Sequence, residues 1–516
     1  MKGLFTLLFS FGAATALAQT PAIQWQKALG GTGEDIARSI QQTTDGGYIM
    51  AGSSRSNNGD VSGNHGREDV WVVKLDNTGA IQWQKALGGT DDDIAYSIQQ
   101  TTDGGYIVAG ASASTNGDLS GNHGYFDSWV VKLDNTGAIQ WQKSLGGTDN
   151  DIAYSIQQTT DGGYILVGNS RSTNGDVTGN HGNGDAWVVK LDNTGIIQWQ
   201  KALGGTNYDD ASSIQQTTDG GYIVAGYSNS NDGDISGNHG GRDFWVVKLD
   251  NIGAIQWQKA LGGTGLDDAS SIQQTADGGY IIAGNAGSND GDVSGFHGGI
   301  GPDSWVVKLD NTGAIQWQKA LGGTGFDNGS SIQQTADGGY IIAGLSNSND
   351  GDVTGNHGDV DYWVVKLNNA GAIQWQKSMG GTGVDGARSI QQTADGGYIT
   401  AGYSRSNDGD VSGHHGNDDY WIVKLGPDPA AVSNVSPDAA FSLYPNPAQN
   451  EIFLQSTEAI RTIAVMDLSG KKVAQFSGNN ASEMTLPTTG LANGTYFVRV
   501  ETASGATTQK VLISRP

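Results

Sequence analysis

The chain has 516 residues, with 28 Lys and Arg against 53 Asp and Glu, so its formal net charge is −25. It contains no cysteine, which excludes a disulfide scaffold, a thiol enzyme and a zinc-finger module. The acidic charge argues against nucleic-acid binding, because phosphates need a basic surface. Glycine is abundant, with 81 residues, but it follows no three-residue period, which excludes collagen.

The first 18 residues have the pattern of a secretory signal peptide. Lys2 supplies a positive charge, residues 4–11 are apolar, and residues 16–18 form a small-x-small cleavage site, Ala-Leu-Ala. We prefer this interpretation to a buried N-terminal helix. No later segment reaches the roughly 18 consecutive apolar residues of a transmembrane helix, so we expect an exported protein without such a segment.

The region 19–426 is one unit repeated seven times. Each unit carries an Asp-Gly-Gly-Tyr motif and two tryptophans, and these account for all 14 tryptophans of the chain. Equivalent tryptophans are 58 residues apart, with one interval of 60. The first lies in Ile-Gln-Trp-Gln-Lys (Trp25, Trp83, Trp141, Trp199, Trp257, Trp317 and Trp375), and the second lies in Trp-Val-Val-Lys-Leu or a close variant (Trp71, Trp129, Trp187, Trp245, Trp305, Trp363 and Trp421).

Each unit predicts four short strands. In the first unit these are residues 39–43, 48–52, 71–75 and 81–87, where side chains alternate with the period of two that is typical of strands. The Asp-Gly-Gly sequence between the first two strands is a strong hairpin signal. No segment has the apolar stripe of an amphipathic helix.

Seven units of four strands predict an all-β fold, a seven-bladed β-propeller. A tight turn joins the strand at Trp71 to the strand at Trp83, so both belong to one blade. The chain begins with a spare strand at Trp25, and the last unit lacks one. We therefore expect the N-terminal strand to complete the last blade and remove an open sheet edge. An open solenoid, or a ring whose blades begin at Ile-Gln-Trp-Gln-Lys, is the alternative.

The longer loops of such a ring share one face, and one of them resembles a calcium-binding loop. Oxygen-bearing side chains occupy its positions 1, 3, 5 and 12, with glycine at position 6. The fifth copy, which ends at Asp303, has a two-residue insertion that would displace the last ligand. The predicted ligands are Asn58, Asp60, Ser62 and Asp69; Asp232, Asp234, Ser236 and Asp243; Asp350, Asp352, Thr354 and Asp361; and Asp408, Asp410, Ser412 and Asp419.

A simpler interpretation of these loops is that their polar side chains cap turns and bind no metal ion. The loops place Ser or Thr at position 5, end on Asp where a bidentate Glu is usual, and have no flanking helices. Their side chains are therefore equally suited to bonding local backbone amides as turn caps. Calcium is the one cofactor that the sequence suggests, and no other is indicated.

Seven histidines recur with the repeat, and equivalent points on neighbouring blades lie too far apart for one zinc ion. We expect each to bond within its own loop: His65, His123, His181, His239, His297, His357 and His415. No nucleophile elbow, zinc-protease motif or phosphate loop is present. The arginines look too few and too scattered for a carboxylate clamp. Because every polar residue recurs in equivalent positions, we expect no catalytic constellation.

Function is expected where the copies differ. On the long-loop face, aromatic and basic side chains occur in single copies, and exposed aromatics on loops are suited to contacts with a sugar or a protein. Neutral drift in a solvated loop is the alternative. The predicted binding residues are Tyr125, Phe126, Tyr208, Arg242 and Phe326.

The composition changes after residue 426. Residues 427–440 are rich in Pro and Ser and predict a linker. Residues 441–516 lack the repeat and predict a small β-sandwich. Its expected strands are residues 451–455, 462–467, 472–476, 495–501 and 508–514, with a hairpin turn at 467–470.

Several short motifs of this tail form a recognisable set, and their main residues are Tyr444, Pro445, Asn446, Pro447, Asp467, Gly470, Gly494, Tyr496 and Lys510. With these motifs the tail resembles the type A sorting domain of the type IX secretion system of Bacteroidota. The resemblance implies contact with that secretion machinery, passage across the outer membrane, and release or attachment at the surface of a Gram-negative cell. The repeats resemble secreted bacterial β-propeller repeats with no assigned activity.

These features predict a secreted or surface-anchored, non-enzymatic β-propeller that binds a glycan or a surface protein through its long-loop face. One alternative is a secreted hydrolase acting on polysaccharide, with a pocket at the propeller axis. It would need two carboxylates roughly 5–10 Å apart. Another alternative is a purely structural surface protein.

Overall fold

The computed structural model describes residues 20–429, 441–467, 471–502 and 506–515. The chain divides into two units, Met1–Pro429 and Ala430–Pro516. The predicted signal peptide and residues 430–440 of the predicted linker lie outside the described residues. The described residues form strands and turns only, which confirms the all-β prediction. They include no helix with the length and apolarity to cross a membrane.

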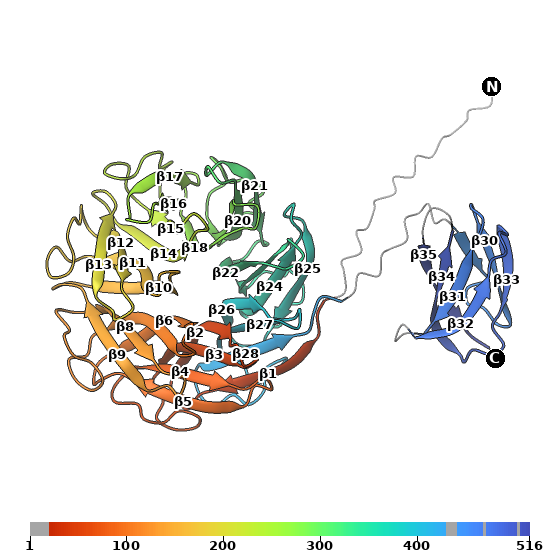
Figure 1. The fold of residues 1–516 in the computed structure, drawn as a ribbon, viewed down its shortest axis with the longest axis horizontal. Helices are drawn as coiled ribbons and strands as arrows, with labels where there is room; N and C mark the ends of the chain where they lie inside the picture. The colour runs from red at the N-terminus through yellow and green to blue at the C-terminus, as the bar shows by residue number, and fades with distance from the viewer. Residues whose placement is uncertain (1–19, 430–440, 468–470, 503–505, 516) are drawn as a thin grey trace. The chain divides into compact units, whose positions relative to one another are not determined.

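The first unit consists of seven antiparallel sheets of four strands each, arranged in a ring (Figure 1). The innermost strands are β2 (Asp35–Gln42), β6 (Asp93–Gln100), β10 (Asp151–Gln158), β14 (Asp209–Gln216), β18 (Asp267–Gln274), β22 (Asp327–Gln334) and β26 (Asp385–Gln392). The second strands are β3 (Tyr48–Ser54), β7 (Tyr106–Ser112), β11 (Tyr164–Ser170), β15 (Tyr222–Ser228), β19 (Tyr280–Ala286), β23 (Tyr340–Ser346) and β27 (Tyr398–Ser404).

The third strands carry the second tryptophan of each repeat: β4 (Asp69–Leu75), β8 (Asp127–Leu133), β12 (Asp185–Leu191), β16 (Asp243–Leu249), β20 (Asp303–Leu309), β24 (Asp361–Leu367) and β28 (Asp419–Leu425). The outermost strands are β5 (Ile81–Leu87), β9 (Ile139–Leu145), β13 (Ile197–Leu203), β17 (Ile255–Leu261), β21 (Ile315–Leu321), β25 (Ile373–Met379) and, from the N-terminus, β1 (Ile23–Leu29).

The last sheet is assembled from both ends of the repeat region. Its strand order is β1-β28-β27-β26, and β1 pairs antiparallel with β28, with Gln26 opposite Val423. This is the pairing that the sequence predicts. It leaves no unpaired outer edge on β28, so the ring needs no further strand to close.

The sheets are held together by apolar packing between neighbouring blades. Trp71 and Val73 of β4 pack against Ile422 of the preceding blade, whereas Val70 and Val72 pack against the following one. Both faces of β4 are therefore buried, and its burial is complete from end to end. A buried aromatic side chain of this size removes about 150–250 Å² from water, so the repeated tryptophans supply much of the core.

The second unit is a sandwich of two sheets. One sheet has the order β29-β30-β33 (Phe441–Tyr444, Glu451–Ser456 and Glu483–Pro487), and the other has the order β32-β31-β34-β35 (Lys472–Ser477, Thr462–Met466, Gly494–Glu501 and Ala506–Ile513). Side chains of both sheets form one core. The predicted sandwich and its five strands are present, but β29 and β33 are additional, and residues 468–470 of the predicted turn lie outside the described residues.

Candidate binding pocket on the propeller axis

A β-bulge in each innermost strand aims one side chain at the axis of the ring. In the pairing of β2 with β3 the register shifts between Ala37 and Ser39, which leaves Arg38 as an extra residue. The same shift occurs in the other six blades. A bulge bends its strand and re-aims the extra side chain. The seven re-aimed residues are Arg38, Tyr96, Tyr154, Ser212, Ser270, Ser330 and Arg388.

These seven side chains line one pocket of about 400 Å³, which we call the axial pocket, together with Asp210, Tyr227 and Asn328. Each innermost strand begins where the long loops end, and the re-aimed residue is its fourth. The axial pocket therefore lies in the half of the ring nearer the long loops. Because the lining differs from blade to blade, it breaks the symmetry of the repeat.

One side of the pocket is basic. Arg38 and Arg388 come from neighbouring blades, because ring closure places β2 beside β26, where Gln42 N donates to Gln391 Oε1. The guanidinium carbon of Arg38 lies 5.0 Å from the ring centre of Tyr96, and that of Arg388 lies 5.5 Å from Tyr403. The Nε atoms of both arginines are buried, and neither has a hydrogen-bond partner among the described residues. Held against aromatic rings with donors to spare, they are suited to receiving an anion.

The wall beside the arginines is aromatic. The rings of Tyr96 and Tyr154 meet edge to face, with their centres 5.0 Å apart. Burial raises the pKa of both phenols, so they are neutral at physiological pH. They present apolar ring faces together with hydroxyl groups, a combination suited to a ligand that carries both apolar and polar surfaces.

The opposite side of the pocket is acidic. Asp210 lies at a position that holds Ile36, Ile94 and Ile152 in the first three blades. Burial raises the pKa of its carboxyl to about 6, against the opposing effect of hydrogen bonds that include one from Tyr208. The Tyr208 hydroxyl donates to Asp210 Oδ2 at 3.2 Å. Within the part of the chain that the structure describes, the buried Oδ1 atom has no partner.

Two of the predicted binding residues lie at this acidic side. The ring of Tyr208 stacks on that of Tyr227 at 6.1 Å, and the guanidinium carbon of Arg242 lies 4.7 Å from the Tyr227 ring centre. Arg242 also forms an ion pair with Asp268 at 3.3 Å. Both residues thus support the pocket wall.

None of the five predicted binding residues lines the axial pocket itself, and the other three belong to the loops. Tyr125 is 71% exposed, Phe326 is 38% exposed, and Phe126 is half-buried beside Tyr125. They remain available for contacts on the long-loop face.

Sequence reasoning missed the two arginines that matter most. It treated the arginines as scattered, whereas ring closure brings Arg38 and Arg388 into one pocket although 350 residues separate them. A signal was present in the repeat. The position between the recurring Ala or Gly and the recurring Ser of the innermost strand varies among Arg, Tyr and Ser, while the Ser-Ile-Gln-Gln after it does not vary.

The predicted calcium ligands make hydrogen bonds within the protein, although the buried Oδ1 atoms of Asp69, Asp243, Asp361 and Asp419 have no partner among the described residues. Asn58 Oδ1 accepts a hydrogen bond from Thr32 N at 2.9 Å, and Asp60 Oδ2 accepts one from Gly30 N at 3.3 Å. Ser62 Oγ accepts one from Gln84. The described residues contain no group of three or more His, Asp or Glu side chains that could hold a metal ion. The contacts are those of capped turns, and calcium binding stays a prediction.

The recurring histidines bond within their own loops, as predicted. His65 Nδ1 lies 2.7 Å from Asp69 Oδ2, which also accepts a hydrogen bond from His65 N at 2.9 Å. The equivalent histidine–aspartate contact recurs in the other six copies. Asp69 thus bonds through Oδ2 to a residue of its own loop, and its side chain is fully buried.

The sorting motif of the tail holds the first and last strands of the second unit together. Asn446 Oδ1 accepts a hydrogen bond from Leu512 N at 2.9 Å, and its Nδ2 donates to Lys510 O at 3.2 Å. The Tyr496 hydroxyl donates to Ala492 O at 3.1 Å. The motif residues thus have a structural role in this domain.

The geometry defines an all-β protein in which a propeller of repeated four-stranded sheets is followed by a small β-sandwich. Residues 442–514 match the family of secretion system C-terminal sorting domains. The tail is therefore a sorting domain of the type IX secretion system, which confirms the resemblance seen in the sequence. Such a domain indicates a secreted or cell-surface protein that engages this secretion machinery.

The whole chain also has more distant likenesses. It is 24% identical over 415 residues to the regulatory protein FlaEY of Caulobacter vibrioides, covering 70% of this chain and 42% of that protein, so the chain spans less than half of that relative. Similar solved structures include the extracellular domain of the one-component system BT4673 from B. thetaiotaomicron, at 11% identity and a TM-score of 0.39, covering 94% of this chain and 58% of that one. BamB from Moraxella catarrhalis is 14% identical with a TM-score of 0.33, covering 93% and 99%.

Proposed function

We propose that this secreted propeller is a non-enzymatic binding protein that captures an acidic glycan in its axial pocket. The observation that carries the proposal is the pair formed by Arg38 and Arg388, whose buried Nε atoms have no partner among the described residues. In a chain of net charge −25, two such guanidinium groups in one pocket favour a ligand that brings its own carboxylate or sulfate.

The other residues that line the axial pocket favour a carbohydrate as the ligand. Tyr96 and Tyr154 offer ring faces for a sugar, and the serines, Asn328 and Asp210 offer partners for its hydroxyl groups. The volume of about 400 Å³ falls within the range of small-molecule sites. The exposed Tyr125 and Phe326 on the loops offer further contacts for a longer glycan.

The composition of the pocket supports binding over hydrolysis. Glycoside hydrolysis needs two carboxyl groups flanking the scissile bond. Asp210 is the single acidic residue among those that line the axial pocket. Its neighbour Asp268 is engaged by Arg242 in an ion pair.

A glycan array tests the proposal. The full-length protein is compared with the double variant Arg38→Gln/Arg388→Gln and with Arg67→Gln, a control that removes a 70% exposed arginine from the long-loop face. We expect the wild type and the control to bind glycans with uronate, sialate or sulfate groups. The double variant should bind them at least tenfold more weakly, because each lost charged hydrogen bond is worth about 1.5–3 kcal/mol.

Three outcomes would overturn the proposal: equal binding of neutral and acidic glycans, unchanged binding by the double variant, or no glycan bound. Turnover of chromogenic glycosides, lost in Asp210→Asn, would instead establish the hydrolase.

A further inference from the structure

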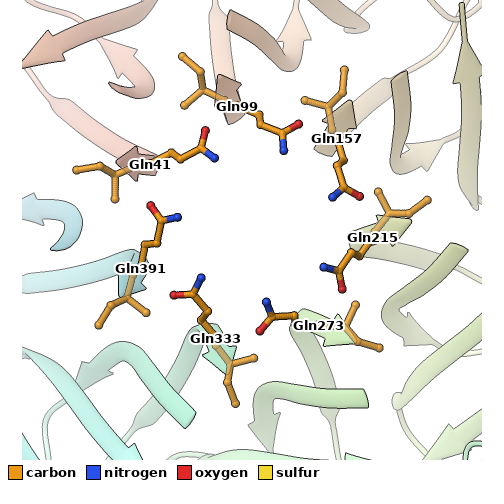
Figure 2. A pocket seen from close by; sticks show the side chains of 14 residues that line it. Gln41, Gln99, Gln157, Gln215, Gln273, Gln333 and Gln391 are labelled. Carbon is orange, nitrogen blue, oxygen red and sulfur yellow. The ribbon is translucent and has the colours of Figure 1, made fainter. Parts of the chain in front are cut away.

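A second feature of the axis is a ring of seven glutamines, one from each innermost strand. They lie three residues beyond the re-aimed residues of the axial pocket, nearer the tight turns. With one isoleucine per blade they line a cavity of about 260 Å³ (Figure 2). We call this set the glutamine ring: Gln41, Gln99, Gln157, Gln215, Gln273, Gln333 and Gln391.

Every amide oxygen of the ring is already used. Gln41 Oε1 accepts a hydrogen bond from the backbone N–H of Gln100 in the next blade, at 2.7 Å. The same bond recurs between each pair of neighbouring blades at 2.6 or 2.7 Å. The seventh bond joins the last blade to the first, where Gln391 Oε1 accepts a hydrogen bond from Gln42 N at 2.7 Å.

These bonds fix which way each amide faces. The backbone N–H is a donor, so the side-chain atom that meets it must be the oxygen, and the NH₂ group is left on the other side. Figure 2 shows the seven nitrogens turned toward the axis and the seven oxygens turned away from it. These seven hydrogen bonds thus arrange seven neutral amides as a ring of converging donors.

No negatively charged side chain in the lining competes for these donors. The fourteen lining residues are isoleucines and glutamines, so none of them is a carboxylate. No ring NH₂ group donates to a protein acceptor within the described ranges. A cavity that offers converging N–H groups and no carboxylate in its lining is complementary to an oxyanion. We propose that the glutamine ring binds one small oxyanion of the phosphate or sulfate class on the axis. This site does not depend on the axial pocket or on its glycan.

The test is a calorimetric titration of inorganic phosphate into the full-length protein at constant ionic strength. The double variant Gln99→Glu/Gln273→Glu keeps an oxygen for each backbone N–H but turns a second oxygen toward the axis. The matched control Gln100→Glu adds the same kind of charge one residue further along β6, where the side-chain oxygen accepts from Thr44 N at 2.9 Å. Gln100 is not among the residues that line the cavity.

For the glutamine ring we expect one phosphate per wild-type chain, affinity within about twofold in the control, and at least tenfold weaker binding in the double variant; phosphate bound at the axial pocket is removed by titrating each protein in the Arg38→Gln/Arg388→Gln background. Absence of binding to the wild type, or equal binding by the double variant and the control, would overturn the proposal. Arg38→Gln/Arg388→Gln should keep the phosphate of the glutamine ring, whatever it loses at the axial pocket; complete loss of phosphate binding in this variant would place the anion in the axial pocket and also overturn the proposal.

NMR spectroscopy of the wild-type protein tests the site even if the double variant does not fold. In wild-type protein labelled with ¹⁵N-glutamine, phosphate should shift side-chain amide signals of the glutamine ring, and unmoved signals would refute the site. Repeating the titration with glucose 6-phosphate distinguishes the sources of the oxyanion. Binding only of inorganic phosphate indicates a free ion, and equal binding of both indicates an ester on a larger ligand.

Discussion

Arg38 and Asp210 show how single substitutions give a symmetric scaffold an asymmetric site. Each lies in a strand whose sequence otherwise largely follows the repeat. At each of the two positions most other blades carry a different residue. The bulge at position 38 is present whichever residue occupies it. The backbone therefore supplies seven equivalent positions on the axis, and the side chains at them decide what is bound.

The raised pKa of Asp210 predicts a pH dependence for the binding of an acidic glycan. Burial raises this pKa to about 6, so the carboxyl is charged at pH 7.5 and largely protonated at pH 5. Protonation removes a negative charge that repels the ligand. We expect affinity to rise as the pH falls from 7.5 to 5, as measured by calorimetry. Asp210→Asn should bind at pH 7.5 about as the wild type does at pH 5, and an unchanged pH profile in this variant would contradict the assignment.

At the scale of elements, each hairpin is anchored by a nearly buried lysine. Lys132 of β8 is 3% exposed, and its Nζ lies 2.9 Å from Asp103 Oδ2 in the Asp-Gly-Gly turn. Partial burial raises the pKa of Asp103, but hydrogen bonds from Thr101, Lys132 and the turn prevail and hold it near 2. The carboxylate therefore contributes stability above about pH 4 that is lost as the pH falls through 2.

Asp103→Asn should lower the free energy of unfolding by about 1–3 kcal/mol, because it leaves Lys132 with no charged partner in the turn. Asp134→Asn is the control, since Asp134 caps an exposed turn with its Oδ1 and an asparagine oxygen can do the same. Urea denaturation at pH 7 measures both. Equal effects of the two substitutions would show that the ion pair contributes nothing beyond turn capping.

The junctions between blades predict the opposite pH dependence. Burial raises the pKa of Asp93 to about 6, and the nearby Asp69 raises it further. The pKa of Asp69 is also raised by burial, and its Oδ1 has no partner among the described residues, as in the six equivalent aspartates. The folded state binds these protons more tightly than the unfolded chain does. Their contribution to stability is therefore complete below about pH 4 and is lost as the pH rises through 6.

We expect Asp69→Asn to raise the urea midpoint at pH 7.5, because it removes one of two neighbouring buried charges, and to have little effect at pH 4.5. The asparagine oxygen can still accept from His65 N. A lower midpoint at pH 7.5 would show that the junction needs the charge.

The long loops give a further prediction at this scale. Asp410 Oδ2 already accepts from Gly380 N at 3.4 Å, and Asp419 Oδ2 accepts from His415 N at 2.7 Å. Because one oxygen of each carboxylate already bonds to the protein, we expect equal melting temperatures in calcium and in EDTA, although Asp419 Oδ1 has no partner among the described residues. A rise in calcium that disappears in Asp410→Ala and Asp419→Ala would establish the loops as metal sites.

For the whole molecule, the pairing of β1 with β28 is the link that makes a chain of repeats into a ring. The Trp421 indole donates to Gln26 Oε1 at 2.9 Å across this pairing. Removing residues 20–29 should lower the melting temperature and cause self-association, because it exposes the edge of β28. Removing residues 441–516 should leave the propeller's melting temperature unchanged. A monomer of wild-type stability after removal of β1 would contradict this role.

The repeat made much of the fold predictable from the sequence. The axial pocket could not be predicted, because its residues come together only when the ring closes. The tryptophan spacing, the Asp-Gly-Gly turns and the unmatched strand at Trp25 are local signals, and the structure follows them. The bulge at Arg38 interrupts the alternation of side chains, so the predicted strand, residues 39–43, begins only after it, whereas β2 already begins at Asp35. The sequence could not show that Arg388 becomes the neighbour of Arg38, since that depends on closure over the whole repeat region.

The most direct test of glycan binding in the axial pocket is a crystal structure of the protein soaked with a galacturonic acid tetrasaccharide. We expect a sugar carboxylate within hydrogen-bond distance of Arg38 and Arg388, with a sugar ring against Tyr96 or Tyr154. An oligosaccharide bound only on the loops around Tyr125, with solvent in the axial pocket, would contradict it.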